Sequence, residues 1–244
     1  MNENDLLASI PTQLFIAGEW TDATGGGTLD VRDPATNRVI ATIADATPED
    51  GARALDAAVA AQEAWAATAP RERSNVLRRA FDLVQERKEE LALLMTLEMG
   101  KPLAEARGEV AYGGEFLRWF SEEAVRIQGR YGLNPEGTGH MIVSQRPVGP
   151  CFFITPWNFP NAMITRKVAP GLAAGCTMVY KPANLTPLTS LYVVDVLREA
   201  GLPDGVLNVV CTTDAGGVVE PWIDSGIARK LSFTGSTPVG RKLL

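Results

Sequence analysis

Apolar residues follow two different periods along the first 128 residues of the chain. Short apolar runs at 14–16 and 39–43, bounded by turn-forming residues, predict β-strands. From Thr47 onward, apolar residues lie three or four positions apart, which is the period of a helix buried on one side. The sequence therefore predicts a β-hairpin followed by a helical scaffold.

The first long helix is predicted to begin after Thr47, whose hydroxyl can cap it, with Pro48 at its first position. Its buried face is expected to hold Ala52, Leu55, Val59, Gln62 and Trp65. A later helix contains Gly113 and Gly114, and a glycine inside a helix costs about 1 kcal/mol relative to alanine. This pair predicts close packing of the later helix against another segment.

Four largely apolar runs occupy the second half of the chain, at residues 151–154, 177–180, 206–210 and 231–233. They begin 26, 29 and 25 residues apart, close to the ~30 residues of a strand–helix–strand unit. Apolar strands that alternate with helices predict an α/β fold with a parallel sheet covered on both faces. Ligands of such sheets bind beyond the carboxyl ends of the strands.

Composition narrows the class of protein without identifying it. The chain has 244 residues, of which 45% are hydrophobic and 21% charged, as in soluble globular proteins of one large or two small domains. It has 23 basic and 29 acidic residues, and the net charge of −6 argues against nucleic acid or an anionic membrane as a partner. We recognise no targeting segment or membrane span and expect a cytoplasmic protein.

Residues that could carry out catalysis unaided are few. The three cysteines, Cys151, Cys176 and Cys211, are widely spaced and form no CxxC motif, which argues against a disulfide framework and a metal site. We expect them to be small buried hydrophobic residues, because no histidine or lysine is adjacent in sequence. The single histidine, His140, excludes a mechanism that needs a histidine pair.

Polar groups at the predicted carboxyl ends of strands are candidates for chemistry. Asn158 lies between two prolines, so its amide can donate to an oxyanion, or it can be a turn asparagine that bonds its own backbone. Lys181 ends a strand, where its ammonium can bind ribose or phosphate, or reach water. The turn GSTPVG (235–240) can place backbone N–H groups against a phosphate, although Arg241 stands where a Walker loop has lysine.

Several motifs together resemble the aldehyde dehydrogenase superfamily, in the family's order and at its spacing. They are FIAGEW (15–20), LEMGKPLAEARGEV (97–110), ITPWNFP (154–160), AAGCTMVYKPAN (173–184), GLPDGVLNVV (201–210) and KLSFTGSTPVG (230–240). Within the family, MITRKVAPGLAAGC (163–176) is most similar to succinate-semialdehyde dehydrogenases. The resemblance implies an aldehyde-dehydrogenase-like fold: a Rossmann-type parallel sheet, incomplete in this chain and preceded by a β-hairpin and a helical segment.

The same resemblance implies a function and a domain plan. The expected reaction is the NAD- or NADP-dependent oxidation of an aldehyde to a carboxylic acid, with succinate semialdehyde as the expected substrate and succinate as the product. Residues 1–128 and 147–244 would form the cofactor-binding domain. Residues 129–146 would begin a bridging element, through which the intact enzyme would form a homo-oligomer.

Residue roles follow from the resemblance as well. Asn158 would donate to the oxyanion of the reaction, and Lys181 would bind the adenosine ribose. Arg166 would pair with the distal carboxylate of a semialdehyde, whereas its chemistry alone also allows a structural ion pair with an acid. Asn184 replaces a glutamate common in NAD-preferring members, so tolerance of NADP is expected. No metal is expected. The expected cofactor-binding residues are Thr155, Pro156, Trp157, Asn158, Lys181, Pro182, Ala183, Asn184, Gly235, Ser236 and Gly240.

The family's nucleophilic cysteine and general-base glutamate follow the FTGS motif (233–236), and neither of their segments is found in this sequence. We therefore expect the catalytic domain to be absent, and the chain alone to be inactive and poorly soluble. Three interpretations stay open. The chain is the amino-terminal half of a semialdehyde dehydrogenase, a stand-alone nucleotide-binding or interaction module, or part of a dehydrogenase for another aldehyde.

Overall fold

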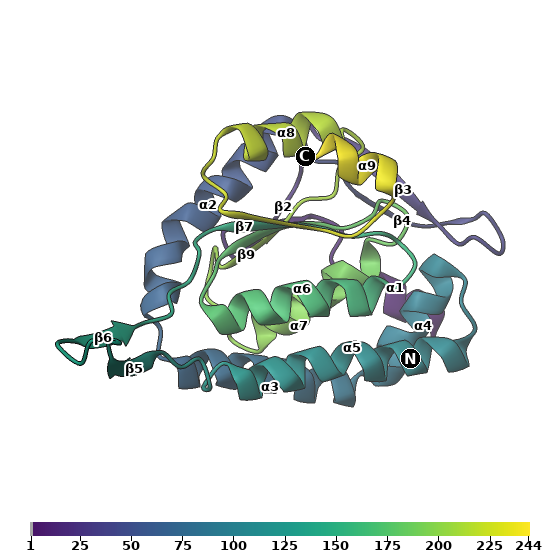
Figure 1. Ribbon diagram of the computed structural model, residues 1–244. Helices are drawn as coiled ribbons and strands as arrows, with labels where there is room; N and C mark the ends of the chain where they lie inside the picture. Colours follow the sequence, from purple (N-terminus) through teal and green to yellow (C-terminus); the bar gives the residue numbers. More distant parts are fainter. Residues whose placement is uncertain (1) are drawn as a thin grey trace.

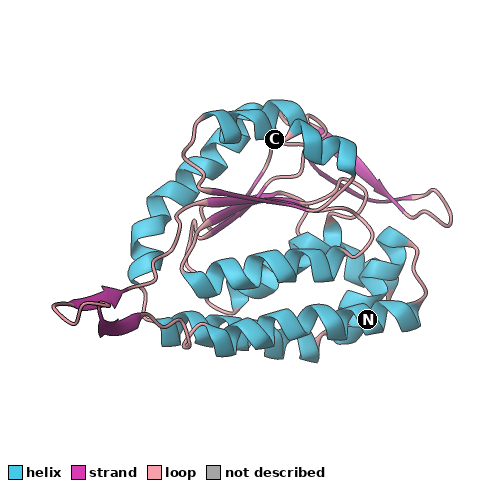
Figure 2. Ribbon diagram, viewed as in Figure 1, coloured by secondary structure: helices cyan, strands magenta, loops and turns pink. Residues whose placement is uncertain are grey.

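The structure is a computed structural model, and it describes residues 2–244. Its helices and strands are coloured by type in Figure 2. The helices are α1 (Glu3–Ser9), α2 (Pro48–Ala67), α3 (Pro70–Glu86), α4 (Lys88–Met99), α5 (Leu103–Glu123), α6 (Pro160–Ala174), α7 (Leu188–Glu199), α8 (Ala215–Asp224) and α9 (Thr237–Lys242). The strands are β1 (Leu14–Ile16), β2 (Glu19–Thr21), β3 (Thr28–Arg32), β4 (Val39–Ala44), β5 (Arg130–Leu133), β6 (His140–Val143), β7 (Cys151–Ile154), β8 (Met178–Lys181), β9 (Leu207–Val209) and β10 (Lys230–Phe233).

The elements form layers around one six-stranded sheet (Figure 1). Helices α2 and α8 cover one face of the sheet, and α6 and α7 cover the other. Helices α3, α4 and α5 form a further layer outside α6 and α7. This arrangement confirms the α/β class and the helical scaffold that the sequence predicts.

The strand order is β10-β7-β8-β9-β1-β2. The four apolar runs of the second half form β7, β8, β9 and β10, and these pair in parallel as predicted. The predicted strands at 14–16 and 39–43 are β1 and β4, but they do not pair with each other: β1 forms a hairpin with β2, and β4 pairs with β3 in a separate two-stranded sheet. Strand β1 pairs antiparallel with β9, through Phe15 and Val209, so the hairpin extends the parallel sheet and makes it mixed.

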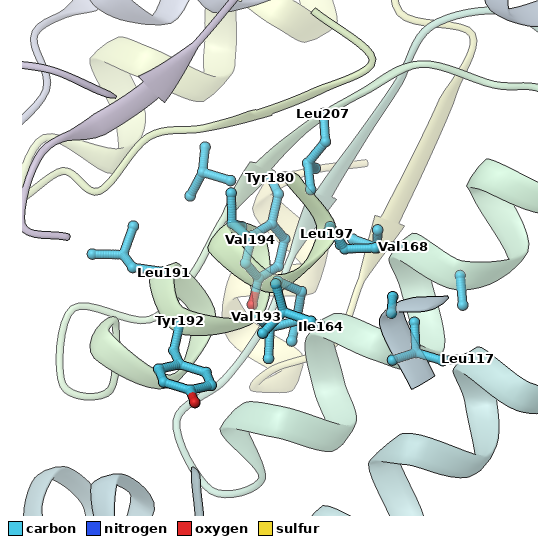
Figure 3. Close-up of a cluster of buried hydrophobic side chains, with 14 of the residues drawn as sticks. Leu117, Ile164, Val168, Tyr180, Leu191, Tyr192, Val193, Val194, Leu197 and Leu207 are labelled. Carbon is cyan, nitrogen blue, oxygen red and sulfur yellow. The ribbon is translucent and has the colours of Figure 1, made fainter. Parts of the chain in front are cut away.

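The core between the sheet and its lower helices is made of aliphatic and aromatic side chains (Figure 3). The ring of Tyr180 from β8 points toward α7, where Val194 and Leu197 are fully or almost fully buried. Ile164 and Val168 of α6 complete this contact. Burial of such side chains contributes about 1.5–3 kcal/mol each, which fixes the strands whose ends form the cleft described below.

Helix α2 begins as predicted, and its inner face is confirmed at Leu55 and Trp65 but not throughout. Thr47 caps it in a reciprocal capping box with Asp50, and Pro48 is at its first position. The expected inner residues Ala52 and Val59 are exposed. Small residues face inward instead, because α8 packs so closely that a Cβ on Gly51 would lie 2.9 Å from a methyl carbon of Val218.

The outer helices cap the helices of the sheet layer through two buried carboxylates. Neither α6 nor α7 has a capping side chain of its own. Glu98 of α4 accepts the backbone N–H groups of Leu188 and Thr189 at 2.7 and 2.8 Å. Glu109 of α5 accepts those of the first residues of α6, at 2.9 and 3.1 Å. These bonds satisfy N–H groups that a helix start leaves without partners.

The predicted close packing of Gly113 and Gly114 is confirmed. A Cβ on Gly113 would lie 2.3 Å from the side-chain nitrogen of Asn161, at the contact of α5 with α6. A Cβ on Gly114 would lie 2.9 Å from that of Gln85 in α3. The two glycines therefore let α5 approach two neighbouring helices at once.

Strands β5 and β6 form a separate two-stranded hairpin that projects from the rest of the chain (Figure 1). Its apolar side chains are exposed, among them Tyr131, Leu133 and Ile142. The assignment of 129–146 to a bridging element stays a prediction. Within residues 2–244, no helix combines the length and the apolar character needed to cross a bilayer.

Candidate functional site

The carboxyl ends of β7, β8 and β10 border a cleft of about 590 Å³, at the sheet edge where the sequence predicts a ligand. Helices α8 and α9 form its far wall. The charged residues of its lining are two lysines and one glutamate. The lining residues are Ile154, Thr155, Pro156, Trp157, Lys181, Ala183, Ala215, Gly216, Val219, Glu220, Ile223, Phe233, Thr234, Gly235, Ser236, Val239, Lys242 and Leu243.

Most of the predicted cofactor residues meet in this cleft. Those that line it are Thr155, Pro156, Trp157, Lys181, Ala183, Gly235 and Ser236. The predicted residues outside its lining are Asn158, Pro182, Asn184 and Gly240. Gly240 lies in a neighbouring hollow, where a Cβ on it would be 3.2 Å from the ring of Phe233.

Lys181 places a buried cation at the cleft, with 7% of its surface exposed. Its ammonium donates to the carbonyl oxygen of Pro182 at 3.2 Å and to Oδ1 of Asn184 at 3.5 Å. Burial lowers the pKa of Lys181 below its ordinary value. Because both hydrogen-bond partners are neutral, an anionic or polyhydroxyl ligand would relieve the cost of burying this charge. The lysine does not extend into water, which was the alternative.

Asn158 lies in an exposed segment whose backbone is hydrogen-bonded to a buried ion pair. Lys101 pairs with Glu109, and their side chains are only 7% and 1% exposed. The Lys101 ammonium also donates to the backbone oxygen of Asn158 at 3.3 Å and lies 4.4 Å from the ring centroid of Phe159. The side chain of Asn158 is thereby left at the surface beside the cleft residue Trp157, where it can donate to a ligand.

Arg166 lies on α6, one helical turn and a half from Asn161 at the helix start. Its Nη2 donates to the hydroxyl of Tyr112 at 2.5 Å, and its guanidinium carbon lies 5.1 Å from the ring centroid of Phe116. These partners carry no charge, so the structural ion pair considered as an alternative is not formed among residues 2–244. The aromatic rings orient a guanidinium whose other N–H groups can receive a planar anion.

Gly235 lies two residues after β10 and lines the cleft. A Cβ on this residue would lie 2.5 Å from the ring of Phe233, which also lines the cleft. Only glycine fits without moving that ring. The next residue, Ser236, is the N-cap position of α9, whose six residues begin with Thr237 and Pro238.

The three cysteines are buried, as predicted. Cys211 lies just after β9, and burial raises the pKa of its thiol to about 12. Cys151 and Cys176 lie at the opposite, amino end of β7 and β8. No cysteine lines the cleft.

Sequence reasoning missed the wall formed by α8. Val219 and Ile223 present apolar surface there, and Glu220 adds a carboxylate. Their spacing of four residues was a usable signal for one helical face. It could not show that this face meets the strand ends, because the connection after β9 decides where α8 lies.

The fold and the cleft define an α/β protein with a cleft at the carboxyl ends of its parallel strands, the place where such sheets bind ligands. The sequence profile described as the Aldehyde dehydrogenase family matches residues 20–244, and the chain belongs to that family.

Individual relatives agree with this membership. The chain is 65% identical, over 84% of its length and 46% of the relative's, to a succinate-semialdehyde dehydrogenase of Paenarthrobacter nicotinovorans. It is 50% identical, over 95% of its length and 48% of the relative's, to a glutarate-semialdehyde dehydrogenase of Pseudomonas putida. It matches a crystal structure described as an NADP-dependent enzyme of Escherichia coli with a TM-score of 0.94 and 45% identity, covering 100% of this chain and 50% of that one. The chain thus spans about half the length of the curated relatives it matches.

Proposed function

We propose that this chain is the cofactor-binding part of an NAD(P)-dependent aldehyde dehydrogenase that oxidises succinate semialdehyde to succinate. The observation that carries the proposal is the cleft of about 590 Å³ at the carboxyl ends of the parallel strands, with the buried ammonium of Lys181 in its wall. Family membership supplies the reaction class. The names of similar proteins supply the semialdehyde.

The cleft fits a nicotinamide dinucleotide. Lys181 offers a cation to ribose or phosphate oxygens, and the apolar side chains of Val219 and Ile223 offer a surface for an aromatic base. Gly235 lets the backbone approach closely, because a larger residue would strike Phe233. When bound, the cofactor supplies the hydride acceptor of the oxidation.

The proposed role of Asn158 is to donate its side-chain amide to the oxyanion that forms when the aldehyde carbon is attacked. Its backbone is held by Lys101, so the amide is oriented before substrate arrives. We do not assign the nucleophile to a cysteine of this chain. Cys211 is 1% exposed with a raised thiol pKa, and Cys151 and Cys176 lie at the other edge of the sheet. Residues 1–244 alone are therefore expected to show no turnover.

Arg166 is the proposed partner of the distal carboxylate of the substrate. Arg166 is charged and partly exposed, and it contacts the neutral groups of Tyr112 and Phe116. Its guanidinium therefore stays available to bind an anion. Glutarate semialdehyde carries the same carboxylate one methylene farther from the aldehyde. It is the second candidate substrate, favoured by the likeness to the Pseudomonas putida enzyme.

Asn184 bears on the choice between NAD and NADP. Its Oδ1 accepts from Lys181, so a neutral amide stands beside the cation proposed to bind the ribose. A ribose 2′-phosphate would meet no carboxylate at this position. We propose that NADP is accepted as well as NAD, and that Asn184→Glu weakens NADPH binding more than NADH binding.

Cofactor binding is the first test. Trp157 lines the cleft, so energy transfer from tryptophan to NADH or NADPH reports binding to the chain itself. Lys181→Met should raise Kd about 10- to 150-fold, the equivalent of losing a charged hydrogen bond of ~1.5–3 kcal/mol. Lys88→Met, at an exposed lysine of α4, is the control and should leave Kd unchanged. Absence of dinucleotide binding by the folded chain would refute the proposal.

Substrate choice needs a whole enzyme. A chimera joins residues 1–244 to the remaining part of the Paenarthrobacter nicotinovorans relative. There Arg166→Ala should raise KM for succinate semialdehyde at least ~10-fold, from the loss of a charge-assisted pair, and leave KM for the neutral butanal nearly unchanged. Arg38→Ala, at an exposed arginine, is the control. Equal effects on both aldehydes would favour a dehydrogenase for a different substrate.

The remaining expectations are part of the same proposal. We place cofactor binding in residues 1–128 and 147–244, and assembly of the intact enzyme into a homo-oligomer at 129–146, where the exposed apolar side chains of β5 and β6 lie. We also propose a cytoplasmic location. Light scattering of the chimera, with and without the hairpin residues 130–143, tests the assembly.

A further inference from the structure

Two cysteines that are 25 positions apart in sequence come together at the amino ends of β7 and β8. Cys151 is the first residue of β7, and its backbone N–H donates to the carbonyl of Thr177 at 2.9 Å. Cys176 directly precedes Thr177, and both cysteines belong to the same buried cluster, in which the Cys151 thiol donates to the carbonyl oxygen of Gly149 at 3.4 Å. The two residues are 2% and 4% exposed. An intramolecular disulfide needs two neighbouring cysteines, and Cys211 lies at the other end of the sheet, after β9.

The surroundings of Cys176 favour its thiolate. The pKa of Cys176 lies below that of an ordinary thiol, because hydrogen bonding from Cys151 and from the backbone of Gly149 and Val148, together with the Arg73 cation, outweighs burial. Donation to Cys176 and burial raise the pKa of Cys151. One member of the pair is thus the nucleophile, and the other stays protonated.

Arg73 is fixed in place by the backbone near this pair. Its Nε donates to the carbonyl of Ala173 at 3.1 Å, and its guanidinium carbon would lie 3.5 Å from a Cβ on Gly175. Arg73 itself is 6% exposed. None of these partners is a carboxylate, so its charge is not cancelled before it reaches the sulfur of Cys176.

The segment beside the pair has no regular structure. Residues 144–150 connect β6 to β7, are exposed or half-buried, and include Gly149, whose carbonyl accepts from the Cys151 thiol. Pro147 of this segment rests on Gly175, where a Cβ would lie 3.0 Å from its ring. Because the segment contains no helix or strand, small local motions suffice to admit a molecule the size of hydrogen peroxide.

We propose that Cys151 and Cys176 form a reversible thiol–disulfide site that is oxidised by hydroperoxides, with Cys176 as the attacking thiol and Cys151 as the resolving thiol. This site is separate from the cleft, which lies at the opposite edge of the sheet. It does not depend on the proposed dehydrogenase function.

The chemistry balances in two steps. The Cys176 thiolate attacks the peroxide oxygen, the O–O bond breaks, and the sulfur becomes a sulfenic acid while hydroxide takes up a proton to leave as water. The sulfur of Cys151 then attacks the sulfenic sulfur, giving the S–S bond and a second water as its own thiol proton is transferred to the leaving oxygen. Two thiols are oxidised to one disulfide, and one hydroperoxide is reduced. A dithiol reductant reverses the change.

The disulfide would join the two ends of residues 151–176. That segment contains Asn158 and Arg166, together with the whole of α6. Oxidation would therefore tie the start of β7 to the end of α6 without touching the cleft. We expect it to leave cofactor affinity within about twofold of the reduced chain, because the lining residues lie beyond the other end of β7.

The test uses the folded chain of residues 1–244. The reduced protein is treated with hydrogen peroxide near pH 7, its remaining thiols are alkylated in denaturant, and its peptides are mapped by mass spectrometry. We expect a mass lower by two hydrogens, a cross-linked pair of peptides containing Cys151 and Cys176, and Cys211 alkylated. Dithiothreitol should restore all three thiols.

Variants separate the roles of the two sulfurs. Cys151→Ser should give a dimedone-reactive sulfenic acid at Cys176, formed at least ~10-fold faster than any product at Cys211. Cys176→Ser should leave Cys151 unmodified, and Cys211→Ser, the matched control, should give the same cross-link as the wild type. Circular dichroism confirms that each variant is folded. If a variant does not fold, the peptide map of the oxidised wild-type chain alone tests whether Cys151 and Cys176 are cross-linked.

Three outcomes would overturn the proposal. The first is no cross-link between Cys151 and Cys176 in the folded chain while peroxide oxidises other residues. The second is a cross-link that forms only in denaturant. The third is oxidation of Cys211 as fast as that of Cys176, which would show that the surroundings of Cys176 confer no reactivity.

Discussion

Lys101→Met is expected to destabilise the chain far more than loss of an exposed cation. The Lys101 and Glu109 side chains are 7% and 1% exposed, so the variant leaves a carboxylate buried without its cation. Removing one partner of such a pair costs about 3–5 kcal/mol. The matched control is Arg107→Met, because Arg107 and Glu89 form an ion pair with 50% and 56% exposure. An exposed pair contributes about 0–1 kcal/mol.

The assay is thermal and urea unfolding followed by circular dichroism. For a chain of this length, ~3–5 kcal/mol corresponds to a lower Tm by about 6–20 °C, whereas the control should move by less than about 4 °C. The double variant Lys101→Met/Glu109→Gln should recover most of the loss, because a neutral amide can still accept from the start of α6. The reasoning is refuted if Lys101→Met is no more destabilising than Arg107→Met, or if the double variant is the least stable of the three.

Three further predictions concern Glu98, Gly235 and Gly113. Burial raises the pKa of Glu98 from 4.5 to about 7, so the folded chain binds this proton more tightly than the unfolded chain does. Protonation of Glu98 therefore stabilises the fold fully below pH ~4.5, and this stabilisation is lost as the pH rises through ~7. The unfolding free energy of the wild type minus that of Glu98→Gln should thus decrease from about pH 5 to about pH 8, and a difference that does not change with pH would contradict it. Gly235→Ala should weaken NADPH binding about tenfold or more by displacing Phe233, and unchanged energy-transfer titrations would show that the turn tolerates a methyl group. Gly113→Ala should lower the free energy of unfolding in urea by about 1–3 kcal/mol, whereas Gly108→Ala, where a Cβ meets nothing within 4 Å, should not lower it. Equal free energies of unfolding for the two variants would mean that α5 can shift to make room for the methyl group.

Local patterns were enough to predict most elements of the fold. The capping box at Thr47, the apolar runs of β7 to β10 and the glycine pair at 113 and 114 each depend on neighbours in sequence or on one repeating period. The parallel pairing of these strands follows from connections of strand–helix–strand length, whereas the place of β10 beside β7 was not predicted. The predicted inner face of α2 was wrong at Val59, which is exposed. Small residues, and not large ones, occupy the face of α2 that α8 approaches closely.

The candidate site was predictable only where it is built from strand ends. Lys181 and Gly235 end apolar runs, and parallel strands bring such ends together at one edge. The pairing of Lys101 with Glu109, and their contacts with the Asn158 segment, depend on the packing of α5 against α6. No local signal in a single sequence shows which buried lysine meets which glutamate.

The buried carboxylates explain how the outer helices can influence a site that they do not line. Glu98 and Glu109 come from α4 and α5, and each accepts two backbone N–H groups at the start of a sheet-layer helix that has no cap of its own. A helix start that depends on a distant carboxylate keeps its place only while the two layers stay together. Because α6 starts two residues after Asn158 and also bears Arg166, its position sets that of both groups. We therefore expect changes at the contact of α5 with α6 to alter substrate oxidation in the chimera while leaving dinucleotide binding at Lys181, which is held by β8 and not by α6, largely intact.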